Sequence, residues 1–272
     1  MTKVIDIVNK FEEFAPKRIA EDGDPIGLQL GSLHNDVHKM MVTLDVRPET
    51  VDEAIENNVD FIFAHHPAMF VPVKKFDLDV PQNAMYAKLI KHDITVYGAH
   101  TNLDNANGGM NDWLAEQLGL ENTEFLLPTK VDPVSNEKYS MGRVGELKDS
   151  LTAVEFAEYC KKVLNLRGLR LIAADNQKPV KRVAVLGGGG SGGRFFNAAL
   201  LHKADAYVTG DISYHTGHDM IAAGLTVVDA GHHIESICKP KLTDKFKKWN
   251  NENDWKIDIY QSKLNTDPFQ FI

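Results

Sequence analysis

Residues 61–67 read Phe61-Ile-Phe-Ala-His-His-Pro67, a short run of strand-forming residues that ends in two histidines and a proline. This arrangement recurs, because seven of the 11 histidines lie in four motifs that each follow such a run. The other three motifs are Val96-Tyr-Gly-Ala-His-Thr-Asn-Leu-Asp104, Tyr207-Val-Thr-Gly-Asp211 followed by His215 and His218, and Val227-Val-Asp-Ala-Gly-His-His-Ile-Glu235. Ligands of open α/β sheets bind beyond the carboxyl ends of the strands. The pattern therefore predicts a site of imidazoles and carboxylates from several strands, which suits a centre with more than one metal ion.

Helical and extended segments alternate along most of the chain, which predicts an α/β fold with mostly parallel sheets. Strands are expected at 40–44, 61–64, 94–99, 143–147, 169–173, 181–186, 205–209, 225–229 and 256–260, with helices between most of them. A break at Leu127-Pro-Thr-Lys-Val-Asp-Pro133 separates two α/β lobes, residues 1–127 and residues 128–272. The segment 230–272 could pack back on the first lobe.

The composition and charge of the chain argue against a nucleic-acid-binding, secreted or membrane-spanning protein. The chain has 272 residues with 30 basic and 38 acidic side chains, and its formal charge of −8 gives no strong signal for binding nucleic acid. The N-terminus lacks the apolar core of a signal peptide, and no stretch approaches the roughly 18 apolar residues of a membrane span. The two cysteines, Cys160 and Cys238, are expected to be buried free thiols. We therefore expect a soluble, cytoplasmic protein without a membrane partner.

The first two motifs offer imidazoles and one carboxylate. Pro67 favours an extended backbone at His66, so the rings of His65 and His66 should point in different directions and could each hold one of two ions. Alternatively, the pair is a polar turn. Asp104 precedes a turn rich in Asn and Gly, where its carboxylate could chelate a cation or simply cap the following helix.

The last motif is expected to open a helix. His232 and Glu235 are three residues apart, so they share a helical face and could address the same ion, although Glu235 could also act as a helix cap. Because the two histidines are adjacent rather than four residues apart, the motif is not that of a zincin protease.

The segment after residue 207 is expected to support the site. Asp211 and His215 are predicted to lie at its rim and to hold ligands or substrate, with an N-cap at Asp211 as the alternative. The run Gly187-Gly-Gly-Gly-Ser-Gly-Gly193 lacks the Lys of a Walker loop, so it is either a tight strand-to-helix turn or a set of backbone amides for an anionic substrate.

Taken in this order, the motifs resemble the Nif three-like family, whose members are also called type 2 homologues of GTP cyclohydrolase I. The resemblance also includes Gly27-Leu-Gln-Leu-Gly31 and extends nearly from end to end. It implies two α/β lobes, a metal site with two divalent ions in the cleft between them, and a homohexamer. It also implies the metal ligands His65, His66, Asp104, His232 and Glu235. Some relatives place the final Glu four residues after the first His, which leaves His233 as an alternative to His232.

Three functions are consistent with this pattern. The first is a metal-dependent hydrolase resembling the GTP cyclohydrolase, in which metal-activated water attacks the C8 atom of a purine nucleotide and His100, Asp211 or His215 transfers protons. The second is a two-metal phosphoesterase, and the third is a non-catalytic protein for metal storage, delivery or regulation. The mixed His and carboxylate set suits zinc, iron, manganese or nickel. A small-molecule substrate, with a nucleotide as the expected class, would be the partner.

Overall fold

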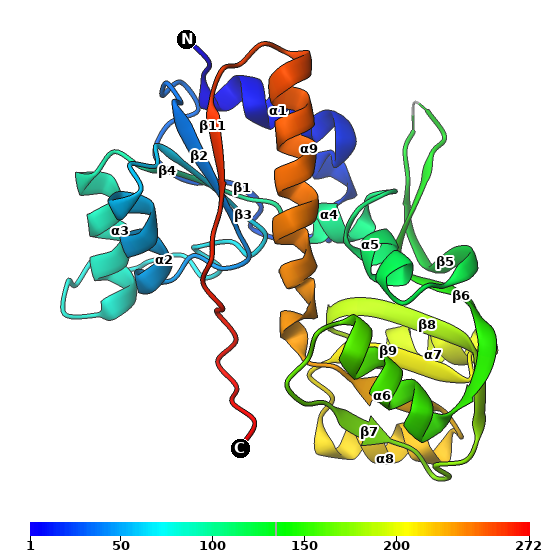
Figure 1. Cartoon of the computed structure of the whole chain (residues 1–272). Helices are drawn as coiled ribbons and strands as arrows, with labels where there is room; N and C mark the ends of the chain where they lie inside the picture. Colours follow the sequence, from blue (N-terminus) through cyan, green and yellow to red (C-terminus); the bar gives the residue numbers. More distant parts are fainter. Residues whose placement is uncertain (134) are drawn as a thin grey trace. The chain divides into compact units, whose positions relative to one another are not determined.

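The computed structural model describes residues 1–133 and 135–272, which form two compact units (Figure 1). Unit 1 contains Met1–Leu103 and Ser236–Thr266, and unit 2 contains Asp104–Glu235 and Asp267–Ile272. The chain passes between the units inside the short helix α4 (Thr101–Asn105) and inside the 3₁₀ helix η2 (His232–Ile237). Two of the predicted ligands, Asp104 and Glu235, are therefore the first and last residues of the main segment of unit 2.

Within the described residues, unit 1 contains a five-stranded sheet with the strand order β1-β4-β3-β2-β11. The strands are β1 (Gly27–Leu30), β2 (Lys39–Thr43), β3 (Phe61–Ala64), β4 (Thr95–Gly98) and β11 (Asp258–Gln261). All neighbouring pairs are parallel except β1 and β4. The helices are α1 (Val4–Phe14), η1 (Lys17–Ile19), α2 (Pro48–Glu56), α3 (Pro81–Lys91) and α9 (Cys238–Glu252).

Helices cover both faces of this sheet, as α2 and α3 lie on one side and α1 and α9 on the other (Figure 1). Strand β3 shows why, because its successive side chains point to opposite faces and all four are apolar. Ile62 belongs to the core formed with α2 and α3. The ring of Phe63 lies 4.7 Å from that of Phe11 on α1 and 4.8 Å from that of Phe246 on α9.

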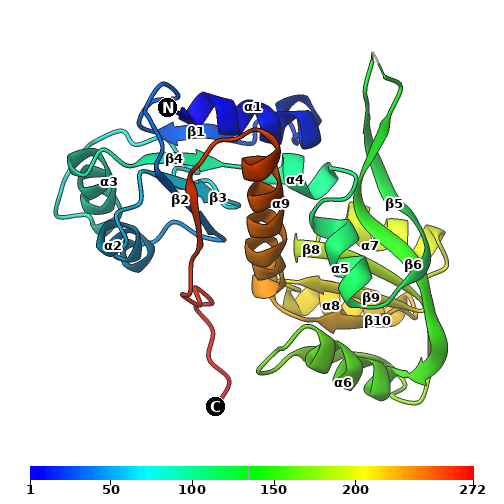
Figure 2. The same cartoon turned by 45° about the horizontal axis from the view of Figure 1, so that its top comes forward.

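Unit 2 contains, in its described part, a six-stranded sheet with the order β5-β6-β8-β9-β10-β7. The strands are β5 (Glu121–Val131), β6 (Lys138–Thr152), β7 (Arg170–Ile172), β8 (Pro179–Gly189), β9 (Ala206–Gly210) and β10 (Thr226–Asp229). Strands β8, β9 and β10 are parallel, whereas β5, β6 and β7 pair antiparallel with their neighbours. Figure 2 shows β5 and β6 side by side as a long hairpin. The helices are α5 (Met110–Gln117), α6 (Ala153–Val163), α7 (Gly193–Leu201) and α8 (Tyr214–Ala222).

The prediction of an α/β fold is confirmed, but both sheets are mixed. Among the described strands, three of the four neighbouring pairs in unit 1 are parallel, as expected, whereas three of the five pairs in unit 2 are antiparallel. The division between the two units lies after Leu103 and not at the predicted boundary near residue 128. Helix α5 packs against β6 and β8, so residues 104–127 belong to unit 2. From the segment 230–272, residues Ser236–Thr266 belong to unit 1 through contacts of α9 with β2 and β11. Cys160 and Cys238 are both buried thiols, as predicted. In the described part of the chain, no helix is long and apolar enough to cross a membrane.

Candidate metal centre

The histidines of unit 1 lie together at the carboxyl ends of three parallel strands. Residues 43, 64 and 98 at the ends of β2, β3 and β4 are in register. The next residues along each strand are therefore adjacent, and they include Asp45 after β2, His65 and His66 after β3, and His100 after β4. One donor atom from each of the three histidines lies within 4.8 Å of the others, so the group could hold a metal ion. This arrangement follows the rule for ligand sites in open α/β sheets.

Each of these imidazoles has its Nδ1 next to an oxygen acceptor. The Nδ1 of His65 is 2.8 Å from the carbonyl oxygen of Ala99, that of His66 is 2.6 Å from Asp45 Oδ1, and that of His100 is 2.9 Å from Asp24 Oδ1. A carbonyl or carboxylate oxygen can only accept, so each Nδ1 donates its hydrogen. The lone pair of each neutral ring is therefore on Nε2, which is the tautomer of a metal-ligating histidine held by its surroundings.

Asp24 is a residue that the sequence reasoning did not assign to the site. Its side chain is 5% exposed, and its carboxylate accepts from His100 and from the backbone N–H and hydroxyl of Thr101. Burial alone would raise the pKa of Asp24, but the hydrogen bonds from His100 and Thr101 outweigh burial and lower it. The Asp24 carboxylate therefore stays ionised and fixes the ring of His100. Asp45, which also accepts from Thr266, fixes His66 in the same way.

Unit 2 contributes a second set of donors. Asp104 and Glu235 are 7% and 2% exposed, and a carboxylate oxygen of one lies within 4.8 Å of a carboxylate oxygen of the other. The Nε2 of His232 is 3.1 Å from Glu235 Oε2, and its Nδ1 is 2.7 Å from Asp211 Oδ2. Two buried carboxylates so close together repel each other in a medium of low dielectric constant. A cation would relieve this repulsion, so the donors of unit 2 fit a metal ion.

Glycines allow the backbone to approach these donors. A Cβ atom on Gly188 would lie 2.6 Å from Glu235 Oε1, and the residue has a φ of +68°. A Cβ atom on Gly210 would lie 2.6 Å from the backbone nitrogen of His232. Neither position tolerates a side chain without movement of the donors. Strand β8 continues to Gly189 and α7 begins at Gly193, so the strand-to-helix turn expected in the glycine-rich run is confined to residues 190–192.

Several details refine the sequence expectations. The chain bends at both histidines after β3 ends at Ala64, and the rings of His65 and His66 lie with centroids 4.9 Å apart and planes inclined at 44°. Asp104 lies in the short helix α4, just before the turn at residues 106–109, and His232 begins a 3₁₀ helix rather than an α-helix. Residues three apart eclipse in a 3₁₀ helix, which still places His232 beside Glu235.

The segment after β9 is only partly as expected. Asp211 lies against the imidazole of His232 and is not the N-cap of α8, since Ser213 caps that helix. The exposed ring of His215 lies 5.4 Å from that of Tyr214 and belongs to none of the donor groups among the described residues. The structure thus brings together His65, His66 and His100 in unit 1, and Asp104, Asp211, His232 and Glu235 in unit 2. It does not bring His215 to either set.

The fold and the site define a two-unit α/β protein with histidine and carboxylate donors that suit a metal ion. The chain belongs to the Duf34/NIF3 (NGG1p interacting factor 3) family, whose model matches residues 2–268. A GTP cyclohydrolase 1 type 2 homolog of Streptococcus pneumoniae is 41% identical over 270 residues, which cover 98% of each chain. A solved structure of a Bacillus cereus protein related to NIF3 superimposes with a TM-score of 0.96 at 31% identity and covers 100% of both chains.

A second relative shows that family members differ in length. The GTP cyclohydrolase 1 type 2 homolog of Bacillus subtilis is 34% identical over an alignment of 367 positions that covers 98% of each chain. This alignment is longer than the 272 residues of the present chain. The Bacillus subtilis protein therefore has residues without a counterpart here.

Proposed function

We propose that this protein binds two divalent metal ions through His65, His66, Asp104, His232 and Glu235 and hydrolyses a purine nucleotide. The observation that carries the proposal is the shared orientation of the histidines, whose Nδ1 atoms are held by oxygens so that Nε2 carries the lone pair. The buried carboxylates of Asp104 and Glu235 supply the negative charge that two cations require. That the two donor sets share one cleft stays a prediction, as do the identity of the metal and the cytoplasmic location.

A divalent ion supplies the same chemistry in any protein that binds it with an open coordination position. When bound, a divalent cation lowers the pKa of a coordinated water to about 7 and polarises a substrate oxygen. The contribution of this chain is to orient the ligands and to move a proton. His100 suits the second task, because Asp24 holds its Nδ1–H and would stabilise the imidazolium that forms when Nε2 accepts a proton. Asp211 supports His232 in the same manner, and no role is proposed for His215.

Two observations favour a nucleotide as substrate. The relatives from Streptococcus pneumoniae and Bacillus subtilis are both named GTP cyclohydrolase 1 type 2 homologs. In unit 1, Phe70 is 62% exposed, and the centroid of its ring lies 6.2 Å from that of His100. An exposed aromatic face beside the histidines can stack on a heterocyclic base.

The decisive assay tests the reaction itself. GTP is incubated with protein that has been loaded with each metal in turn, and chromatography distinguishes a nucleotide that has gained one water molecule from a nucleotide that has lost phosphate. Gain of water at the purine ring supports the hydrolase, phosphate release supports the phosphoesterase, and neither product supports metal storage.

The first prediction concerns the number of ions. Protein reconstituted with zinc or manganese and then desalted is expected to contain about two ions per chain, measured by elemental analysis. His65→Ala and Asp104→Ala should each lower this number while leaving unfolding cooperative, since each removes one buried donor. Full occupancy in both variants would contradict the ligand assignment.

The second prediction concerns the carboxylates that orient the imidazoles. Asp45→Asn and Asp211→Asn should each weaken metal binding by about 10–100-fold, because an amide holds Nδ1–H less firmly and makes the ring a poorer donor. Competition with a chromophoric chelator measures the affinity. Asp149→Asn, at an exposed position in unit 2, is the matched control and should bind like the parent. Equal affinity in all three variants would show that Asp45 and Asp211 do not support ligands.

The third prediction is a homohexamer, which rests on the family resemblance. Light scattering over micromolar concentrations should give a mass about six times the 30.3 kDa of one chain. A stable monomer throughout that range would refute it.

A further inference from the structure

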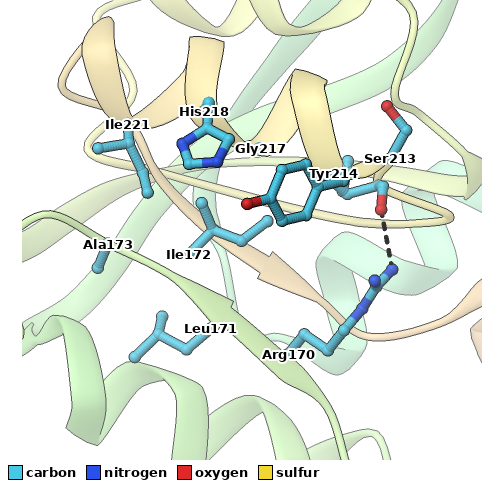
Figure 3. A pocket seen from close by; sticks show the side chains of 10 residues that line it. Arg170, Leu171, Ile172, Ala173, Ser213, Tyr214, Gly217, His218 and Ile221 are labelled. Atoms are coloured by element: carbon cyan, nitrogen blue, oxygen red, sulfur yellow. Dashed lines mark hydrogen bonds between the residues drawn. The ribbon is translucent and has the colours of Figure 1, made fainter.

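A pocket of about 260 Å³ lies in unit 2 between the edge strand β7 and helix α8 (Figure 3). Strand β7 pairs only with β10 among the described strands and forms one edge of the sheet. None of the proposed metal ligands lines the pocket. Its volume is below the roughly 300–1,000 Å³ of sites for drug-sized ligands. The pocket therefore suits a compact molecule with a single ring or a short branched chain.

The two ends of the pocket differ in chemistry. Figure 3 shows Ala173 and Ile221, with the ring of His218 beside Ile221, at one end and Arg170 and Ser213 at the other, with Ile172 between them. The side chains of Ala173, Ile172 and Ile221 favour an apolar body. At the polar end, the guanidinium of Arg170 is 63% exposed, and α8 begins directly after Ser213. A cationic side chain and the positive end of a helix dipole both favour an anion.

Arg170 also connects the pocket to the metal donors of unit 2. Its Nη2 donates to the carbonyl of Ile212 at 3.0 Å, the dashed bond in Figure 3, and to the carboxylate of Asp229. Asp229 is 3% exposed and accepts in turn from the backbone N–H of Ile212 at 3.1 Å and of Gly231 at 3.2 Å. Ile212 directly follows Asp211, and Gly231 directly precedes His232. Asp229 thus holds both segments that carry the pair of Asp211 and His232.

We propose that this pocket is an effector site for a small organic carboxylate with an apolar body, and that its occupation alters the position of His232. The ligand carboxylate would take hydrogen bonds from Arg170 and compete with Asp229 for the guanidinium. Asp229 would then hold Ile212 and Gly231 in a different geometry. The carboxylate site itself is independent of the proposed function, whereas its regulatory meaning rests on the metal centre.

Binding is tested on the metal-free protein with phenylacetate as probe, by titration followed by NMR and by calorimetry. Saturable binding below about 10 mM is expected, with shifted resonances of His218 and Tyr214. Phenethylamine, which has the same body and the opposite charge, and inorganic phosphate, which lacks the body, should each bind at least tenfold more weakly. Absence of saturation by phenylacetate, or equal binding of phenethylamine, would overturn the proposal.

Two variants locate the site. Gly217 lies on α8, and a Cβ atom there would contact Ile172 Cδ1 at an ordinary 3.6 Å. Gly217→Leu should therefore fill the pocket and abolish binding, while the helix itself gains from the loss of glycine. Arg170→Met should weaken binding at least tenfold, and the exposed Arg167→Met is the matched control that should not. Binding that survives Gly217→Leu would place the ligand elsewhere and overturn the proposal.

The effect of the bound ligand on His232 is measured by NMR in the same metal-free samples. Saturation with phenylacetate should shift the ring resonances of His232 and slow or speed amide exchange at Gly231, and both effects should vanish in Gly217→Leu. Binding without any change at His232 would overturn the link to the metal donors. Because no metal is needed, a failure of the proposed metal function would leave this result unaffected and is recognised separately by elemental analysis.

Discussion

Replacing Glu235 with glutamine is expected to weaken metal binding by at least about 100-fold, the upper end of the losses caused by removing groups that only orient ligands. Glu235 is 2% exposed, its Oε2 lies 3.1 Å from His232 Nε2, and an oxygen of Asp104 lies within 4.8 Å. Glutamine keeps its shape but removes one of the two neighbouring negative charges and one anionic oxygen. Chelator competition gives the affinity, and elemental analysis of desalted protein gives the number of ions.

Unfolding of the metal-free proteins separates loss of binding from loss of fold. Without metal, the adjacent carboxylates of Asp104 and Glu235 repel each other, so Glu235→Gln should unfold at the same urea concentration as the parent or higher. The exposed Glu158→Gln in the same unit is the matched control for the change of charge. Normal metal affinity in Glu235→Gln would remove Glu235 from the ligand set.

The same experiment decides between the two adjacent histidines. His232 is the ring that lies between Asp211 and Glu235, so His232→Ala should be as damaging as Glu235→Gln. His233→Ala should have a much smaller effect. If His233→Ala proves the worse of the two histidine variants, the assignment is displaced by one residue. If all three variants bind like the parent, the metal proposal itself fails.

Much of this site could be predicted because parallel strands align their carboxyl ends. The apolar strand 61–64 and the strand 95–98 are recognisable from their residues, so the positions of His65, His66 and His100 at one edge follow from sequence. In unit 2, Asp211 and His232 follow β9 and β10 for the same reason. The register of each sheet then brings these residues together without any information on side chains.

The residues that orient the donors could not be predicted in this way. Asp24 lies in a loop without hydrophobic periodicity, and only the folded chain brings its carboxylate to His100. Strand β5 was not predicted, because most of its residues are exposed and Pro128 lies within it, where a proline is unusual. The division between the units after Leu103 could not be predicted from the sequence either, since it depends on the packing of α5 against β6 and β8 rather than on composition.

The second large effect is expected from Asp112, which anchors α5 to β6. Arg143 is 3% exposed and donates through Nε and Nη2 to the two oxygens of Asp112, both at 2.7 Å. Its Nη1 donates to the carbonyls of Ser140 and Gly142. Removing one partner of a buried pair leaves the other charge uncompensated and typically costs about 3–5 kcal/mol. Asp112→Ala should therefore lower the free energy of unfolding by about this amount, measured as the midpoint of urea denaturation.

Removing the other partner of the pair, Arg143, should destabilise the protein less than removing Asp112, which makes the prediction specific. Asp112 is 30% exposed, so in Arg143→Met its carboxylate can be hydrated, whereas the guanidinium left by Asp112→Ala is buried. For the same reason, the double variant Asp112→Ala/Arg143→Met should unfold at a higher urea concentration than Asp112→Ala alone. The pair of Arg182 and Glu124 in the same unit, whose side chains are 25% and 53% exposed, is the matched control, and Glu124→Ala should shift the midpoint far less because water can hydrate the remaining guanidinium. If Asp112→Ala and Glu124→Ala shift it equally, the buried pair does not hold α5 on the sheet, and the attachment must come from apolar packing alone.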